Sequence, residues 1–307
     1  MCYHLITLAQ RRILSALIKC NGNVAQAAAL KGVTKQYVYE VIKKLREKGV
    51  MFYAEPLYSA LGLELVLCIR ERAIPPKNKE YIIWNAELLH FSSGEREVCI
   101  YAFPIENVNS LIGDLYGQCA YVYRLHDIYQ PSGDASLHEF LDLLRTTKNE
   151  DLEDGQNARQ RIDLIDILII NELMEDFFTP LRKIAEKTGI SENTISYHYR
   201  MHVRNIIRFR YHCPIGRWLF FISFSRIKGL YNAFQEGAFV NYIFKVKEKD
   251  EILAILDLDV DELSRLIKAL YKANRFLEAK VIGTLDYKSI FKKPLPSSKF
   301  INGMWIV

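Results

Sequence analysis

Two histidines, His198 and His202, lie four residues apart in a segment with helical periodicity. This spacing places both imidazoles on one face of a helix, at a separation that suits ligands of one metal ion. His212 and Cys213 follow on the next predicted strand and would complete a set of four ligands. No glutamate follows the first histidine, and the sequence contains no Cys-x-x-Cys pair. We therefore expect these side chains to pack or to contact nucleic acid, and we predict no metal.

Basic and amide side chains occupy one face of each of two predicted helices. The first set, opposite the apolar stripe of residues 35–48, comprises Lys35, Gln36, Tyr39, Lys43 and Lys44. The second set, in the helix expected after Ser191, comprises Asn193, Ser196, Tyr197 and Arg200. Arg208 and Arg210 alternate with aromatic residues on the strand that follows. Such donors suit phosphates and base edges, so these residues are the predicted contacts to double-stranded DNA.

The distribution of charge supports this prediction better than the total does. The whole chain has a formal charge of only +5, which is small for a nucleic-acid binder. Residues 1–60 contain nine Lys and Arg against three acids, and residues 193–217 contain five arginines and no acid. Residues 131–160 contain three basic and seven acidic residues. Two basic regions are thus partly cancelled by an acidic linker.

The elements that must position these residues follow one order twice. Apolar spacing predicts helices over residues 9–19, 24–30 and 35–48, with Gly32 ending the second, Thr34 capping the third and a wing strand after it. A similar pattern returns over residues 162–211, where Gly189 and Ser191 occupy the turn. Both segments are therefore predicted to be winged helix-turn-helix units, whose third helix enters a major groove.

A second pattern follows each unit. After the first, we predict a strand over 63–71, a helix near 79–88, two strands around the turn at Ser93 and Gly94, a helix over 105–116 and a strand over 120–129. Residues 217–287 repeat this order. The order is βαββαβ, which is typical of a ferredoxin-like sandwich. The predicted fold class is α+β, with two winged helix-turn-helix domains each followed by a ferredoxin-like domain.

These patterns divide the chain into four predicted domains, a linker and a tail. Their ranges are 1–60 and 161–214 for the winged helix-turn-helix domains, 61–130 and 215–290 for the ferredoxin-like domains, 131–160 for the helical and acidic linker, and 291–307 for the C-terminal tail.

Residues 32–65 closely resemble the recognition helix, wing and domain junction of the leucine-responsive regulatory protein (Lrp/AsnC) family. The resemblance implies a transcription regulator that dimerises through its ferredoxin-like sheets and presents two winged helices to successive major grooves. In this chain both halves are fused, so the implied DNA-reading helices are not identical and the operator should be asymmetric. The family's glycine-centred effector loop is reduced to Ser93 and Gly94, which argues against amino-acid sensing.

Two alternatives stay open beside the regulator. Fused pairs of Lrp/AsnC-like units also occur as sirohaem decarboxylases, and winged helices also serve as protein-interaction scaffolds. No glycine-rich phosphate loop, GxSxG motif or nucleophilic cysteine motif is present, so we predict no catalysis and no cofactor. The six cysteines are widely spaced and are interpreted as buried thiols in a reducing cytosol. With no long apolar segment, the predicted location is the cytoplasm.

Overall fold

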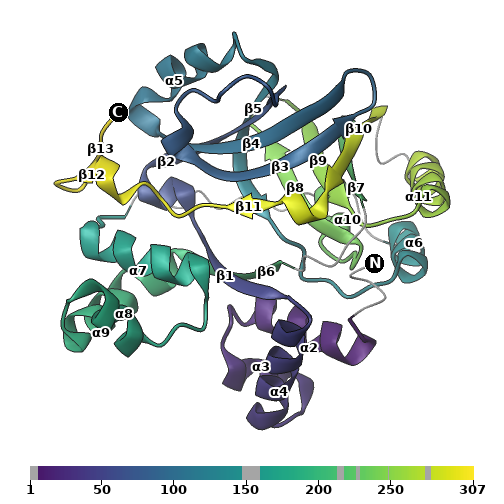
Figure 1. Ribbon diagram of the computed structural model, residues 1–307. Coiled ribbons are helices and arrows are strands. Elements are labelled where there is room, and N and C mark those ends of the chain that lie inside the picture. Colours follow the sequence, from purple (N-terminus) through teal and green to yellow (C-terminus); the bar gives the residue numbers. More distant parts are fainter. Residues whose placement is uncertain (1–5, 147–159, 213–217, 226–228, 248, 274–277) are drawn as a thin grey trace.

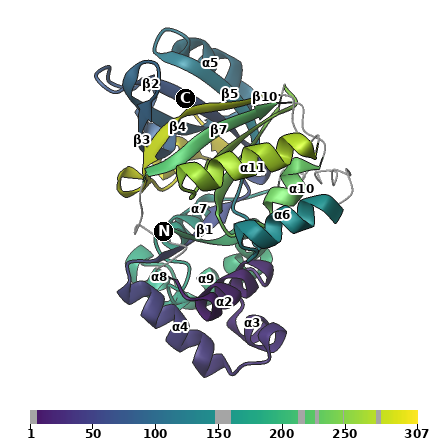
Figure 2. The same cartoon turned by 90° about the vertical axis from the view of Figure 1, so that its right-hand side faces the viewer.

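The computed structural model describes residues 6–146, 160–212, 218–225, 229–247, 249–273 and 278–307 (Figure 1). Strands from both halves of the chain form a barrel, and two helical units lie beside each other at one end of it (Figures 1 and 2). Most of the polar part of the predicted linker, residues 147–159, lies outside the described residues. Within the described ranges, no helix has the length and apolar character that a bilayer crossing requires.

The N-terminal helical unit consists of α2 (Leu8–Lys19), α3 (Val24–Lys31) and α4 (Lys35–Glu47). Local sequence fixes these bounds. Asn23 caps α3, Gly32 ends it in the left-handed conformation at φ 64°, and the hydroxyl of Thr34 accepts a hydrogen bond from the Tyr37 amide at 3.1 Å. Each of these caps satisfies backbone groups that a helix end leaves without partners. The three helices bury one apolar core, as their periodicity predicts.

The second helical unit consists of α7 (Leu164–Glu175), α8 (Leu181–Thr188) and α9 (Glu192–Met201). Asp163 and Asp166 form a capping box at the start of α7. Gly189 ends α8 at φ 71°, and Ser191 caps α9 by accepting the Thr194 amide at 3.2 Å. The glycine turn before the third helix is therefore formed as the sequence predicts.

The two predicted wings are wrong. Strand β1 (Met51–Pro56), expected as the wing of the first unit, pairs antiparallel with β6 (Ile207–His212), expected as the wing of the second. The two strands form one ribbon in which Met51 faces His212 and Pro56 faces Ile207. Because the partners are about 150 residues apart in the chain, no local pattern indicates their pairing. The ribbon lies between both helical units and the barrel (Figure 1).

The ribbon also joins the two helical units. Phe52 of β1 and Phe209 of β6 stack at 5.8 Å between ring centres, inside the core of the N-terminal unit. Phe177, from the loop after α7, donates its amide to the Phe52 carbonyl at 2.9 Å. Arg46 of α4 forms two hydrogen bonds to Asp176, at 2.8 and 2.9 Å. These contacts hold the two units against each other.

The predicted pair of ferredoxin-like domains is also wrong. In the described residues, the main sheet follows the order β10-β7-β9-β8-β5-β2-β4-β3-β11, and β10 also pairs with β3, so that the strands from β10 to β3 form a closed antiparallel barrel. The bounds of the ring strands are β2 (Leu63–Glu71), β3 (Ile82–His90), β4 (Gly94–Pro104), β5 (Cys119–Tyr129), β7 (Trp218–Ser225), β8 (Val240–Val246), β9 (Glu251–Leu256) and β10 (Glu278–Asp286). The ranges 61–130 and 215–290 therefore contribute to one barrel.

Edge pairing explains why a barrel forms. Each set of four strands alone would leave two edges with unpaired amides and carbonyls. Pairing of β5 with β8 joins one pair of edges, where Leu125 faces Val246, and pairing of β3 with β10 joins the other, where His90 faces Gly283. A Cβ at Gly283 would lie 2.4 Å from the carbonyl oxygen of Leu89, so the closing pair needs a glycine there.

Helices cover the outside of the barrel. On β2, Leu65 and Leu67 belong to the interior core, whereas Val66 and Cys68 pack under α5 (Val108–Leu115). Helices α6 (Leu137–Thr146), α10 (Leu230–Phe234) and α11 (Val260–Lys272) cover β7, β8 and β9 (Figure 2). The predicted helix over residues 79–88 is wrong, because only a short 3-10 turn (Lys79–Tyr81) precedes β3.

The C-terminal tail ties the barrel to the second helical unit. Strand β11 (Phe291–Lys292) pairs with β3, and β12 (Phe300–Ile301) pairs with β13 (Met304–Trp305). The side chain of Asn171 in α7 accepts the Leu295 amide at 2.8 Å and donates to its carbonyl at 3.0 Å. The Trp305 indole donates to the Leu61 carbonyl at 2.7 Å. The remaining short 3-10 turns are Tyr58–Leu61, Ile105–Asn107, Val203–Asn205, Tyr287–Ser289 and Ser297–Lys299.

The interpretation of all six cysteines as free thiols is wrong for one pair. Cys68 of β2 and Cys119 of β5 form a disulfide across neighbouring strands. Cys20 and Cys99 are free. The other two cysteines, Cys2 and Cys213, lie outside the described residues.

Candidate nucleic-acid interface

Helix α9 is held at the surface of the second helical unit by its apolar face. Ile195 and His198 are buried against the rest of the unit. The predicted contacts Asn193, Tyr197 and Arg200 are exposed, and Ser196 is half-buried. These positions repeat at helical spacing, so they share the face that is turned to solvent. An exposed helix face with amide, hydroxyl and guanidinium donors is able to contact phosphates and base edges.

Helix α4 presents a second exposed face of the same kind. Its buried residues are Val38, Val41, Ile42 and Leu45. All five predicted contacts are exposed, namely Lys35, Gln36, Tyr39, Lys43 and Lys44. The Gln36 side-chain amide donates to Glu40 at 3.3 Å. The charged members of the set are the three lysines. Helices α3 and α4 lie at the end of the molecule away from the barrel (Figures 1 and 2).

The second helical unit has the arrangement of a helix-turn-helix, in which a glycine turn places a capped third helix at the surface. Residues 162–201 match a family model described as winged helix-turn-helix DNA-binding. This segment is similar to the DNA-binding domains of transcription regulators. The match spans α7, α8 and α9. The chain matches no curated protein and no solved structure.

The two ribbon arginines do not have the placement that contact with a DNA backbone requires. Arg210 is buried, with 6 % of its surface exposed, and one of its guanidinium nitrogens donates to the Phe209 carbonyl at 3.1 Å. Arg208 forms an ion pair with Asp127 of β5 at 3.0 Å. Both side chains lie on the ribbon face that is turned to the barrel, because β6 pairs with β1 rather than with a strand of its own unit.

That face of the ribbon forms a polar layer at the end of the barrel. Glu55 is buried and accepts hydrogen bonds from the Tyr58 hydroxyl at 2.6 Å and from the Lys292 ammonium at 3.2 Å. The Lys292 nitrogen also lies 3.4 Å from the centre of the Tyr53 ring. A cavity of about 270 Å³ adjoins this layer, and Trp84 and His212 are among its lining residues, together with Tyr53, Glu55 and Lys292.

Burial shifts the titration of this layer. Burial lowers the pKa of Lys292 to about 8, although the nearby Glu55 charge opposes the shift. Burial, with the Lys292 charge beside it, lowers the pKa of His212 to about 3, so this imidazole is neutral near pH 7. Burial raises the pKa of Asp127 to about 6, against the effect of Arg208. Arg208, expected to contact DNA, instead joins the ribbon to Asp127 of the barrel.

The polar residues of β5 have contacts inside the barrel wall. Arg124 forms an ion pair with Glu64 of the neighbouring strand β2. The rings of Tyr121 and Tyr123 stack at 6.4 Å, and the Lys280 ammonium lies 5.2 Å from the centre of the Tyr121 ring.

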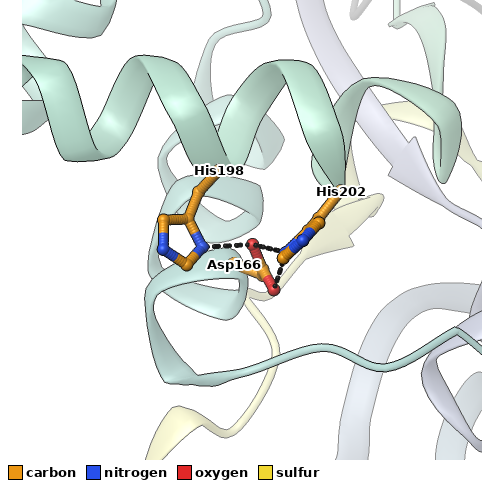
Figure 3. A group of neighbouring side chains, drawn as sticks. All are labelled: Asp166, His198 and His202. Carbon is orange, nitrogen blue, oxygen red and sulfur yellow. Dashed lines mark hydrogen bonds and ion pairs between the residues drawn. The ribbon is translucent and has the colours of Figure 1, made fainter.

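His198 in α9 and His202 just after it lie against a third residue, which their spacing does not predict. Asp166 of α7 lies between them (Figure 3). Its carboxylate is 2.9 Å from His198 Nδ1 and 3.1 Å from His202 Nδ1. His212 instead lies in the ribbon, and Cys213 is outside the described residues. Asp166 sits 32 residues before His198, and its only local signal is its place in a capping box.

Proposed function

We propose that the protein is a cytoplasmic, DNA-binding transcription regulator that uses α9 and α4 to contact major grooves. The observation that carries the proposal is that residues 162–201 resemble winged helix-turn-helix DNA-binding domains and expose Asn193, Tyr197 and Arg200 on the third helix. In a helix-turn-helix domain, the third helix supplies the base contacts. This role needs no catalysis, and we propose that the chain is not an enzyme.

The first helical unit extends the proposal. Its third helix exposes Lys35, Lys43 and Lys44, and residues 32–65 resemble the Lrp/AsnC family at the recognition helix. The Arg46 to Asp176 ion pair and the shared ribbon hold α4 and α9 in one assembly. A fixed pair of reading helices matches two half-sites at a fixed spacing. Since the exposed side chains of α4 and α9 differ, we propose an asymmetric operator.

Selection of binding sequences from a random duplex pool, followed by genome-wide immunoprecipitation of the tagged chain, tests this proposal. The expected result is one enriched motif with two dissimilar halves. An Arg200→Ala variant should relax the sequence preference of one half and leave the other intact, because a base contact is lost only there. Absence of any enriched sequence would refute the specific regulator.

A symmetric motif would refute only the asymmetric operator. A spectrum with a tetrapyrrole absorption band in the purified protein would favour the sirohaem-decarboxylase alternative. Capture of a partner protein without any affinity for DNA would favour the interaction scaffold.

A further inference from the structure

The cluster of Asp166, His198 and His202 has chemistry that DNA binding does not use. All three side chains point toward one another between α7 and α9 (Figure 3). One ligand atom from each lies within 4.8 Å of the others. His198 and Asp166 are buried, while the His202 side chain is 33 % exposed. The group therefore has a closed side, formed by Asp166 and His198, and a side open to solvent at His202.

The cluster places a buried carboxylate between two imidazoles. Asp166 is completely buried, and its second oxygen also accepts the Asp163 amide at 2.9 Å. A second carboxylate, that of Asp163, lies 3.6 Å from His198 Nδ1. Among the described residues, the two imidazoles are the basic groups within 4.0 Å of the Asp166 carboxylate. A nearby positive charge stabilises a buried carboxylate, and a divalent cation bound by these three residues would supply one.

The first helical unit shows that the corresponding helix packing does not require histidines or a carboxylate. There, Val41 and Leu45 are two of the four buried residues of α4, and they are four residues apart, as are His198 in α9 and His202 just after it. Gln10 has the same capping-box position in α2 that Asp166 has in α7. Two apolar side chains and a glutamine therefore occupy these positions in the first unit. The second unit has three residues of metal-ligating types, one aspartate and two histidines, at the corresponding positions.

We propose that Asp166, His198 and His202 form a binding site for a divalent transition metal, with zinc as the best fit. Two imidazoles and one carboxylate are a common ligand set for zinc, at metal–ligand distances of about 2.0–2.2 Å. On binding, Nδ1 of each imidazole bonds to the metal in place of its hydrogen bond to the carboxylate, and any proton held there is released. The exposed side at His202 leaves room for water as a fourth ligand. The Asp163 amide holds the carboxylate in place.

The test uses the untagged full-length chain, stripped with a chelator and then exposed to zinc chloride. After desalting, elemental analysis should find one zinc per chain, and cobalt substitution should give the visible absorption of a tetrahedral Co²⁺ site. Zinc should also raise the midpoint of thermal unfolding, because a metal that binds the folded state stabilises it. A wild-type chain without stoichiometric zinc and without the cobalt spectrum would overturn the proposal.

Two variants and a control make the test specific. The triple variant Asp166→Gln/His198→Val/His202→Leu places at the site the residues that the first unit has at Gln10, Val41 and Leu45, so it leaves no buried carboxylate and should keep its fold and lose the metal. His202→Asn, at the most exposed ligand, gives a second variant that should lower zinc affinity at least tenfold. His138→Ala is the control, since His138 is exposed in α6 and should leave binding unchanged. Retention of one zinc by the folded triple variant would place the metal elsewhere and refute this site.

The proposal does not depend on DNA binding. Its test measures metal content and the cobalt spectrum. The metal site and the DNA-binding function can therefore be refuted independently of each other.

Discussion

Replacing Lys43 and Lys44 together by alanine probes the proposed DNA surface most directly. Both lysines are exposed on α4, so their removal should leave the core of the helical unit intact. Each lysine that neutralises a phosphate contributes about 0.9 to the slope of log K against log salt. The slope of the double variant should therefore be smaller by about 1.8. If the two proteins bind equally well at 1 M salt, the double variant should bind about 60-fold more weakly than the wild type at 0.1 M salt.

The assay is fluorescence anisotropy of a labelled duplex, titrated at several salt concentrations between about 50 and 200 mM. The matched control is the double variant Lys77→Ala/Lys79→Ala, which removes the same charge from exposed positions on the barrel. Lys77 lies beside the end of α5, where its backbone amide donates to the Gln118 side chain. The control should keep the wild-type slope. An unchanged slope in the Lys43 and Lys44 variant, or an equal loss in the control, would refute the assignment of α4 as a DNA-contacting helix.

Three further predictions concern the fold that carries this surface. Gly283→Ala should lower the free energy of unfolding by about 1–3 kcal/mol, because the added Cβ meets a carbonyl of β3, whereas Gly113→Ala, with open space around it, should not destabilise. Lys292→Met should lower the free energy of unfolding by about 3–5 kcal/mol, because it removes the ammonium that pairs with buried Glu55. The double variant Lys292→Met/Glu55→Gln should recover much of this free energy in denaturant titrations. The pKa of His212 is about 3 in the folded protein, below its value of about 6.5 in the unfolded chain. Its contribution to stability is therefore present above about pH 6.5 and is lost as the pH falls toward 3, where the unfolding constant should rise by up to about tenfold per pH unit. His212→Gln should flatten this part of the curve of unfolding free energy against pH.

Helices and their ends could be predicted from local sequence. The bounds of α2, α3 and α4 differ by at most one residue from the predicted ranges, because apolar spacing and capping residues act within one or two turns of the chain. The exposed faces of α4 and α9 follow from the same spacing, since the residues opposite a buried stripe must face solvent. Of the nine candidate DNA-contacting residues on these two helices, eight are exposed and Ser196 is half-buried, while their contact with DNA stays a prediction.

Strand pairing could not be predicted in the same way. Alternation indicated most of the strands, but the pairings of β5 with β8 and β3 with β10 join segments more than 100 residues apart. The same holds for the ribbon. Once β1 is the partner of β6, Arg210 is buried and Arg208 is half-buried in an ion pair with Asp127, whereas a wing strand would turn both to solvent. Which face of a strand is buried depends on its neighbour, and that neighbour is set by the whole fold.

The sequence by itself determined the two helical units, the turns before their third helices and the basic faces of those helices, because each depends on residues close together in the chain. Tertiary structure decided the closed barrel, the shared ribbon and the meeting of Asp166 with His198 and His202. Helical spacing brought the two histidines to one face, but only the packing of α7 on α9 supplied the carboxylate between them.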